Sequence, residues 1–152
     1  MPYKRIKDET NLLAKWKMKA DGRHYFHVFL WKTQKSFIAN ACDVDTTTLG
    51  CANLACTMIR VHEDGTEDIV IRPKLGEVHF IKDQWDLEIV AHELCHALIH
   101  RIRQIKPSFK NIIDQDGRSE EDICYNFGAW VNEIYNHLWK VNPNKKWKRT
   151  KR

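Results

Sequence analysis

Two histidines and a glutamate, His92, Glu93 and His96, have the spacing of a metal-dependent hydrolytic site within VAHELCHALIH, residues 90–100. On an α-helix, residues four apart project side by side, so the rings of His92 and His96 can share one Zn²⁺ ion. Glu93 is turned by about 100° from His92 and can act on a water instead of on the metal. Zinc lowers the pKa of a bound water to about 7, and a neighbouring carboxylate can accept its proton. The three residues therefore predict a zinc site with Glu93 as the general base.

The alternative is a helix that is rich in histidine, with both rings satisfied at its surface. Apolar residues flank the motif and favour the metal site, because they indicate a helix that faces the core. Two imidazoles and a carboxylate placed there without a metal would be costly to bury. His100 shares the same face but lies about 12 Å from His92 along the helix axis. We therefore expect His100 to support the site or to lie at the surface.

A third zinc ligand is expected from Glu120 or Glu121, because catalytic zinc is held by three protein ligands and a water. Both residues begin a second helical pattern, whose apolar stripe has Glu120 at its centre and Glu121 at its edge. A carboxylate directed into an apolar interface is unusual unless it is paired or bound to a metal. Helix geometry favours Glu120, although the phase of a first turn leaves both positions open. The other role for either residue is a favourable interaction with the helix dipole.

The five cysteines do not suggest a second metal site. Cys42, Cys51 and Cys56 lack the C-x₂-C spacing of zinc knuckles, so we interpret them as core or loop thiols. Cys95 is interpreted as a packing residue, and Cys124 has no local partner for a Cys–His pair. The chain shows no apolar signal segment near residue 1, which favours a reduced, cytoplasmic setting. No apolar run approaches the ~18 residues that span a bilayer, so no membrane partner is expected.

Charge is distributed unevenly along the 152 residues, whose formal net charge is +5. Residues 140–152 contain seven Lys or Arg and no acid, residues 1–20 are also basic in balance, and residues 21–139 are acidic in balance. We expect one zincin-like metallopeptidase domain at 1–139 and a basic, flexible tail at 140–152. A solvated terminus is the favoured role of this tail, and contact with nucleic acid through Lys, Arg and Trp147 is the alternative.

Hydrophobic periodicity predicts an α+β fold in which an antiparallel sheet precedes two long helices. The first helix is expected to begin after Asp83 as its N-cap and to stop before Pro107. The second is expected to begin at Ser119. The remaining expected elements are a short helix at 10–20, strands at 24–31, 35–42, 56–63, 66–73 and 76–83, and a loop at 43–55. A turn at Asp64 and Gly65 is expected to join the strands 56–63 and 66–73 into a hairpin.

The sequences AHELCHALIH and SEEDICYNFGAW together resemble the gluzincin-type zincin metallopeptidases, most nearly ImmA/IrrE-like peptidases and short phage-encoded proteins of the same plan. The resemblance covers about residues 76–136 and implies a zinc endopeptidase acting on a protein substrate. It also implies that a strand at 76–83 lines the substrate cleft and that Glu121, four residues before Tyr125, is the third ligand. Cys95 replaces the usual Gly, so the substrate of the ImmA type is not implied.

A second function class remains open beside the enzyme. A zincin scaffold without activity could serve as a zinc-stabilised binding module, such as an antirepressor or a host-interaction factor. Glu93 distinguishes the two classes, because a structural zinc site needs no general base and normally has four protein ligands. The presence of Glu93 favours the enzyme.

Overall fold

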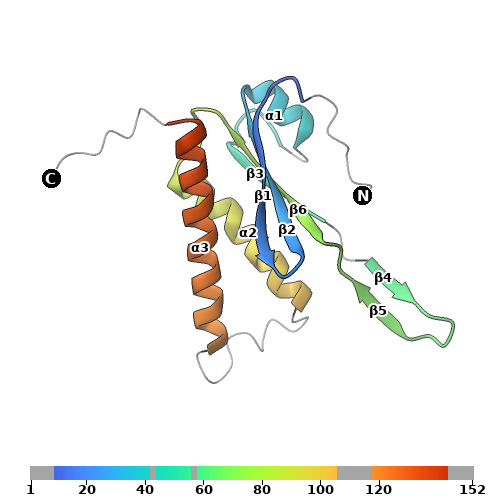
Figure 1. Ribbon diagram of the computed structural model, residues 1–152. Coiled ribbons are helices and arrows are strands. Elements are labelled where there is room, and N and C mark those ends of the chain that lie inside the picture. Colours follow the sequence, from blue (N-terminus) through green and yellow to red (C-terminus); the bar gives the residue numbers. More distant parts are fainter. Residues whose placement is uncertain (1–8, 42–43, 56–57, 106–117, 144–152) are drawn as a thin grey trace.

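The computed structural model describes residues 9–41, 44–55, 58–105 and 118–143. It has an α+β fold with a four-stranded sheet, two long helices, a short helix at one end and a separate two-stranded hairpin (Figure 1). The elements are β1 (Leu12–Asp21), β2 (His24–Trp31), α1 (Gln34–Asn40), β3 (Gly50–Leu54), β4 (Met58–Val61), β5 (Glu67–Val70), β6 (Lys74–Ile81), α2 (Leu87–Ile105) and α3 (Arg118–Val141).

The sheet is mixed, with the strand order β1-β2-β6-β3. β1 pairs antiparallel with β2, and β3 pairs antiparallel with β6, but the central pair β2 and β6 is parallel. The prediction of an antiparallel sheet is therefore wrong for this pair. Parallel strands require a crossover connection, and the chain between β2 and β6 provides one that contains α1, β3 and the hairpin.

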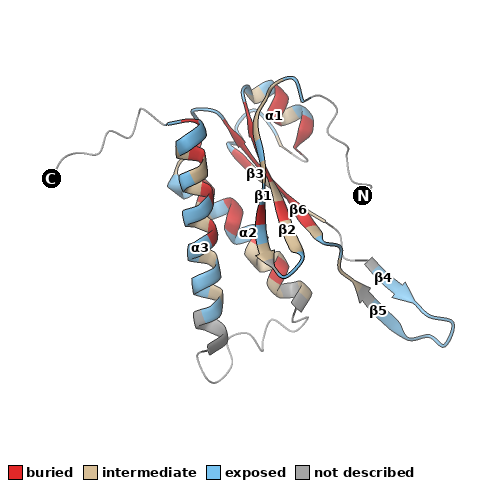
Figure 2. Cartoon of the chain, viewed as in Figure 1, coloured by how far each residue is buried: buried red, intermediate tan, exposed pale blue. Residues whose placement is uncertain are grey.

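The main core lies between the sheet and the two long helices (Figure 2). Alternate residues of each strand face these helices, because side chains of a strand point to opposite faces in turn. The apolar face of each helix closes the core from the other side. The central residues of this core are Phe26, Val28 and Leu30 of β2, Val78 and Phe80 of β6, Val90, Leu94 and Ala97 of α2, and Trp130, Ile134 and Leu138 of α3.

β1 occupies the segment 10–20 that was expected to be a helix, so that prediction is wrong. From Lys15 to Lys19 its residues alternate: Met18 is buried against the helices, whereas Lys17 and Lys19 are exposed on the other face. Lysine, leucine and methionine favour helices intrinsically, but the pairing of β1 with β2 over most of its length outweighs this weak preference. The ring of Trp16 stacks on His137 of α3, with centroids 4.6 Å apart.

The segment 35–42 forms the helix α1, so the strand predicted there is also wrong. Thr33 caps this helix: its hydroxyl accepts a hydrogen bond from the backbone N–H of Ser36 at 3.2 Å. Phe37 of α1 packs with Phe29 and Trp31 of β2 in a second, smaller core on the opposite face of the sheet. Helix α1 therefore covers one end of that face.

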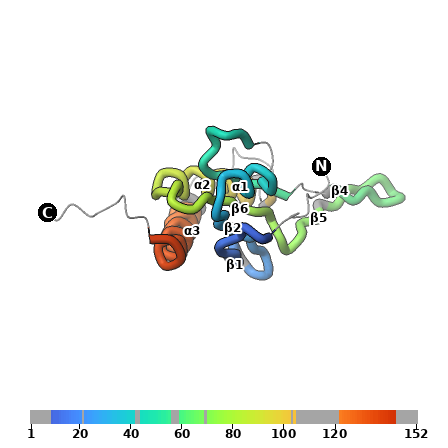
Figure 3. The backbone as a smooth tube through the Cα atoms, turned by 90° about the horizontal axis from the view of Figure 1, so that it is seen from above, coloured from blue at the N-terminus to red at the C-terminus, as the bar shows by residue number. Residues whose placement is uncertain are grey.

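The hairpin predicted around Asp64 and Gly65 is confirmed by β4 and β5, which pair antiparallel. Gly65 has a φ of 81°, which a glycine adopts readily, and Asp64 accepts a hydrogen bond from the backbone N–H of Thr66. The hairpin extends away from the body of the molecule (Figure 3). The strands predicted at 24–31 and 76–83 are confirmed as β2 and β6, but the loop predicted at 43–55 contains the strand β3.

Asn142 joins the end of α3 to the turn before α2. Its side chain accepts hydrogen bonds from the backbone N–H of Asp83 at 2.8 Å and from Trp85 Nε1 at 2.9 Å. Asp83 has a φ of 63° and lies in this turn, so the prediction that it caps α2 is wrong. The cap is Asp86, whose Oδ1 accepts from the N–H of Ile89 at 2.8 Å.

The second long helix was expected from Ser119, and α3 confirms it within one residue. Helix α3 continues to Val141, and Asn142 is buried. The predicted boundary after residue 139 therefore falls inside the folded part, and residues 144–152 of the predicted tail lie outside the described residues. In the described part of the chain, no helix is both long and apolar enough to cross a membrane.

Candidate metal centre

Helix α2 presents His92 and His96 on its exposed side. The rotation of the helix is fixed by Val90, Leu94 and Ala97, which are fully buried on the opposite side. The two rings are neighbours: their Nε2 atoms are 3.2 Å apart and their centroids 4.8 Å apart. The structure thus brings together the two histidines that the sequence singled out. Both rings are exposed, so the expectation that the two imidazoles would be buried on the core-facing side of the helix is wrong, and of the three motif residues only Glu93 is buried.

The separation of these two nitrogen atoms fits a shared zinc ion. Histidine nitrogens bind zinc at about 2.0–2.1 Å, so two of them in a tetrahedral site lie roughly 3.3 Å apart. The 3.2 Å between His92 Nε2 and His96 Nε2 agrees with this value. Without a metal, the same contact is a hydrogen bond in which one ring donates and the other accepts.

Glu93 points from α2 toward the sheet and is 7% exposed. Burial raises the pKa of its carboxyl group, while nearby His92 and His96 and the backbone N–H of Ala52 act in the opposite direction. The N–H of Ala52 belongs to β3 and donates to this carboxylate. Glu93 is therefore held between the histidine pair and a strand of the sheet.

Gly50 allows β3 to approach α2 this closely. A Cβ atom added at position 50 would lie 2.9 Å from both Glu93 Cγ and Ile89 Cγ2. Contacts that short do not occur between real atoms of this kind, so only glycine fits without a shift of the helix. This segment was predicted to be a loop, and the role of Gly50 was not predicted.

β3 is the strand of the sheet that lies beside Glu93. It lies at an edge of the sheet, whereas β6 is paired on both sides, with β2 and with β3. A strand paired on both sides has no free backbone groups for a further strand. The expectation that residues 76–83 line the cleft through backbone pairing is therefore wrong, and Gly50–Leu54 is the available edge.

The third ligand was predicted to be Glu120 or Glu121, at the start of the second long helix. Glu120 and Glu121 lie in the first turn of α3, and their side chains are outside the described set. Among the described residues, no three His, Cys, Asp or Glu side chains come together in a metal-binding group. The choice between Glu120 and Glu121 remains a prediction.

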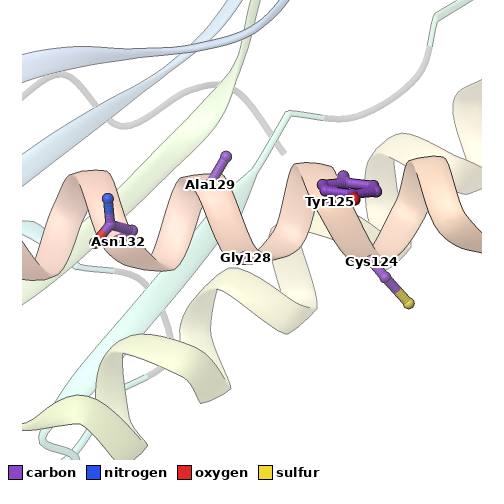
Figure 4. A pocket seen from close by; sticks show the side chains of 5 residues that line it. All are labelled: Cys124, Tyr125, Gly128, Ala129 and Asn132. Carbon is purple, nitrogen blue, oxygen red and sulfur yellow. The ribbon is translucent and has the colours of Figure 1, made fainter.

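A shallow pocket lies on α3 directly after this first turn. It has a volume of about 550 Å³, and the described residues that line it all come from α3 (Figure 4). Tyr125, one turn after position 121, is 75% exposed at its rim. The lining residues are Cys124, Tyr125, Gly128, Ala129 and Asn132.

The other candidate residues lie apart from the histidine pair. His100 contacts Gln104 through Nε2 at 3.1 Å, in keeping with a place outside the site. Cys95 is exposed, so its interpretation as a packing residue is wrong, and Cys124 is an exposed free thiol. Cys51 is a half-buried free thiol of β3, while Cys42 and Cys56 lie outside the described residues.

A buried polar network around His79 was not predicted. Trp31 Nε1 donates to His79 Nδ1 at 3.0 Å, and His79 Nε2 lies 3.2 Å from Glu77 Oε2. These contacts fix the neutral tautomer with its proton on Nε2, which donates to Glu77. Glu77 also accepts from Lys74 at 2.7 Å. Polar residues at every second position of an otherwise buried strand were the signal in the sequence.

Comparison of this chain with protein-family models, with curated proteins and with solved structures gave no match.

Proposed function

We propose that this protein is a zinc-dependent endopeptidase with a zincin-like arrangement, in which His92, His96 and a carboxylate from Glu121 or Glu120 hold the metal. The observation that carries the proposal is the 3.2 Å separation of His92 Nε2 and His96 Nε2 next to the buried carboxyl of Glu93. This combination of two converging ligands and a third, non-coordinating acid suits hydrolysis.

Each described residue has a separate task in this proposal. A bound zinc ion would polarise a carbonyl group and lower the pKa of a water molecule. Glu93 accepts the proton of the attacking water and passes it to the leaving amine. The N–H of Ala52 orients the carboxylate of Glu93 for these transfers.

The edge strand β3 supports a protein substrate over a small molecule. An extended peptide can pair with the outer edge of β3 at Gly50 and Leu54, on either side of Ala52, whose N–H already donates to Glu93. Such pairing places a peptide bond close to Glu93, because Gly50 and Ala52 both contact this residue. We expect substrates of several residues in extended form.

The alternative function is a non-catalytic binding module that keeps zinc for stability. It is supported by the exposed position of both histidines, which would also suit a site that only anchors a partner. It does not account for a buried glutamate whose carboxyl accepts from the N–H of Ala52 and lies near both histidines. The two proposals predict opposite results for Glu93→Gln.

The test compares Glu93→Gln with Glu88→Gln, which changes an exposed glutamate of the same helix. Zinc content should be the same in both variants, because no ligand is altered. Hydrolysis of unfolded protein substrates should fall by roughly 10²–10⁴-fold for Glu93→Gln and should be unchanged for Glu88→Gln. Zinc-loaded wild type that cleaves no peptide in a proteome-derived library would overturn the endopeptidase and leave the binding module.

A further inference from the structure

The face of the sheet opposite the long helices carries a row of lysines beside aromatic rings. Lys15, Lys17 and Lys19 of β1 are opposite Phe29, His27 and Tyr25 of β2, respectively. Residues directly opposite in a pair of strands project from the same face. We call Lys15, Lys17, Lys19, Tyr25 and His27 the lysine face.

Helix α1 leaves the lysine face accessible. Its contacts with β2 are at Phe29 and Trp31, toward the far end of that strand. The three lysines of β1 are exposed, and Tyr25 and His27 are half-buried. Alternate residues of a strand are about 6.5–7 Å apart, so the three ammonium groups form an evenly spaced line along the edge of the sheet.

The lysine face has an excess of positive charge. Lys15 lies 3.5 Å from the exposed Glu9, but in the part of the chain that the structure describes Lys17 and Lys19 have no acidic partner. Glu77, which lies opposite His27 on β6, is buried and forms an ion pair with Lys74 at 2.7 Å.

The positive charge of nearby lysines affects the pKa of His27. Burial and then the charges of Lys74 and Lys15 lower the pKa of His27 to about 4, with a smaller contribution from Lys17, while Glu77 opposes the change. The neutral ring leaves a polar atom unsatisfied, because among the described residues Nδ1 of His27 is covered yet has no hydrogen-bond partner. Buried polar atoms normally have one, so a ligand that reaches His27 could supply it.

Aromatic rings lie directly under the lysines. The ammonium group of Lys17 is 4.5 Å from the ring centroid of Tyr25, and the ring of Tyr25 is 5.1 Å from that of His27. Lysines on an edge strand can simply prevent unwanted strand pairing, but this role requires no aromatic rings. A positive groove with stacking rings is the arrangement that binds single-stranded nucleic acid without sequence preference.

We propose that the lysine face binds single-stranded nucleic acid, with phosphates on Lys15, Lys17 and Lys19 and a base stacked on Tyr25. This surface is separate from the basic tail at 140–152. It is also on the opposite side of the sheet from His92 and His96, so binding here does not require the zinc site.

The experiment measures the fluorescence anisotropy of a labelled 20-nucleotide thymidine oligonucleotide with the full-length chain at several salt concentrations. The test variant combines Lys15→Gln, Lys17→Gln and Lys19→Gln. The control variant combines Arg60→Gln, Lys82→Gln and Lys140→Gln, which are exposed residues on other elements and remove the same charge. Because each contact with a single-stranded phosphate contributes about 0.7 to the log–log salt slope, the test variant should lower the slope by about 2 and weaken binding at least tenfold. The control variant should change binding less than threefold.

A second pair of variants tests stacking. Tyr25→Leu should weaken binding about tenfold, whereas Tyr25→Phe, which keeps the ring, should bind as wild type does. A duplex of the same length should bind more weakly than the single strand, because its bases are already stacked.

Equal losses for the two lysine variants would overturn the proposal, since they would indicate a general charge effect. Complete loss on deletion of 143–152, with no effect of the lysine-face variant, would assign binding to the tail instead. Retention on vesicles that contain phosphatidylserine, without any binding of the oligonucleotide, would likewise overturn it in favour of a lipid surface.

Discussion

Gly50 of the edge strand and Glu93 of helix α2 lie in direct contact, and a Cβ at position 50 would come within 2.9 Å of Glu93 Cγ. The position of the proposed general base therefore depends on the absence of a side chain in another element. The contact therefore connects β3, the edge strand where we propose that substrate binds, to Glu93 of α2, the proposed general base.

Gly50→Ala should displace Glu93 and reduce peptide hydrolysis by at least tenfold. Forcing an extra carbon into a packed site also costs about 1–3 kcal/mol of unfolding free energy, which urea denaturation measures. Gly128→Ala is the matched control: a Cβ there meets nothing within 4 Å, and alanine should stabilise this exposed helical position by about 0.5–1 kcal/mol. Full hydrolytic activity of Gly50→Ala would contradict this prediction, because it would show that α2 shifts to accommodate the extra carbon without displacing Glu93 from its working position.

Zinc should bind at one equivalent per chain, and His92→Ala or His96→Ala should abolish this stoichiometry in elemental analysis. Removal of the metal by a chelator should lower the melting temperature of wild type but not of either histidine variant, because bound ligand stabilises only the form that holds it. His100→Ala is the control and should keep the metal. Uptake of less than half an equivalent by wild type would contradict the site.

The third ligand should be distinguished by Glu121→Gln and Glu120→Gln. We expect the first to weaken zinc affinity more than the second, since the resemblance to gluzincin peptidases assigns this role to Glu121. Competition with a fluorescent zinc chelator measures both affinities under the same conditions. The reverse order would support the position favoured by helix geometry.

His79 should make the fold less stable at mildly acidic pH. Burial lowers the pKa of this histidine below its usual 6.5, so the unfolded chain binds a proton more readily than the folded chain. Its contribution to stability is complete above pH 6.5 and is lost as the pH falls below that value, by up to about 1.4 kcal/mol per pH unit.

Urea unfolding at pH 7.5 and at pH 5.5, with a chelator present, measures this effect. His79→Gln can still accept from Trp31 and donate to Glu77, but it does not titrate. Its loss of stability between the two pH values should be smaller than that of wild type. His27 is unchanged in both proteins and contributes equally. Identical losses of stability in wild type and His79→Gln would exclude His79 as the source of the pH dependence.

Asn142 should matter more to stability than the residues after it. Asn142→Ala removes acceptors for the N–H of Asp83 and for Trp85 Nε1, and unsatisfied buried donors cost about 1–3 kcal/mol. Asn136→Ala, at an exposed position of α3, is the control. Deletion of 143–152 should leave stability and zinc content unchanged. A large loss of stability from this deletion would contradict the prediction that Asn142 matters more than the residues after it.

The sequence was most informative where local pattern and tertiary packing agree. Helix α2 could be predicted because its apolar period also sets which residues face the sheet, and this fixed the side-by-side placement of His92 and His96. The hairpin could be predicted from Asp64 and Gly65, because Asp-Gly is a dipeptide that tight hairpin turns favour. Both conclusions depend on residues close together in the chain.

Predictions failed where distant segments decide the structure. The segment containing Lys17 and Met18 is a strand because β2 is available to pair with it, which its helix-favouring composition does not reveal. β3 was missed because it is short and its key residue, Gly50, is recognisable only once Glu93 lies against it. The edge that a substrate can use therefore required the tertiary structure.

The contribution of α3 to the core has a consequence for synthesis on the ribosome. Trp130, Ile134 and Leu138 cover the face of the sheet formed by strands that precede them by 49 residues or more. During translation, the apolar face that includes Phe26 and Phe80 is complete before its cover has emerged. Uncovered sheet surfaces of this kind promote aggregation of nascent chains. Binding by a chaperone until Leu138 has emerged should therefore increase the yield of folded protein.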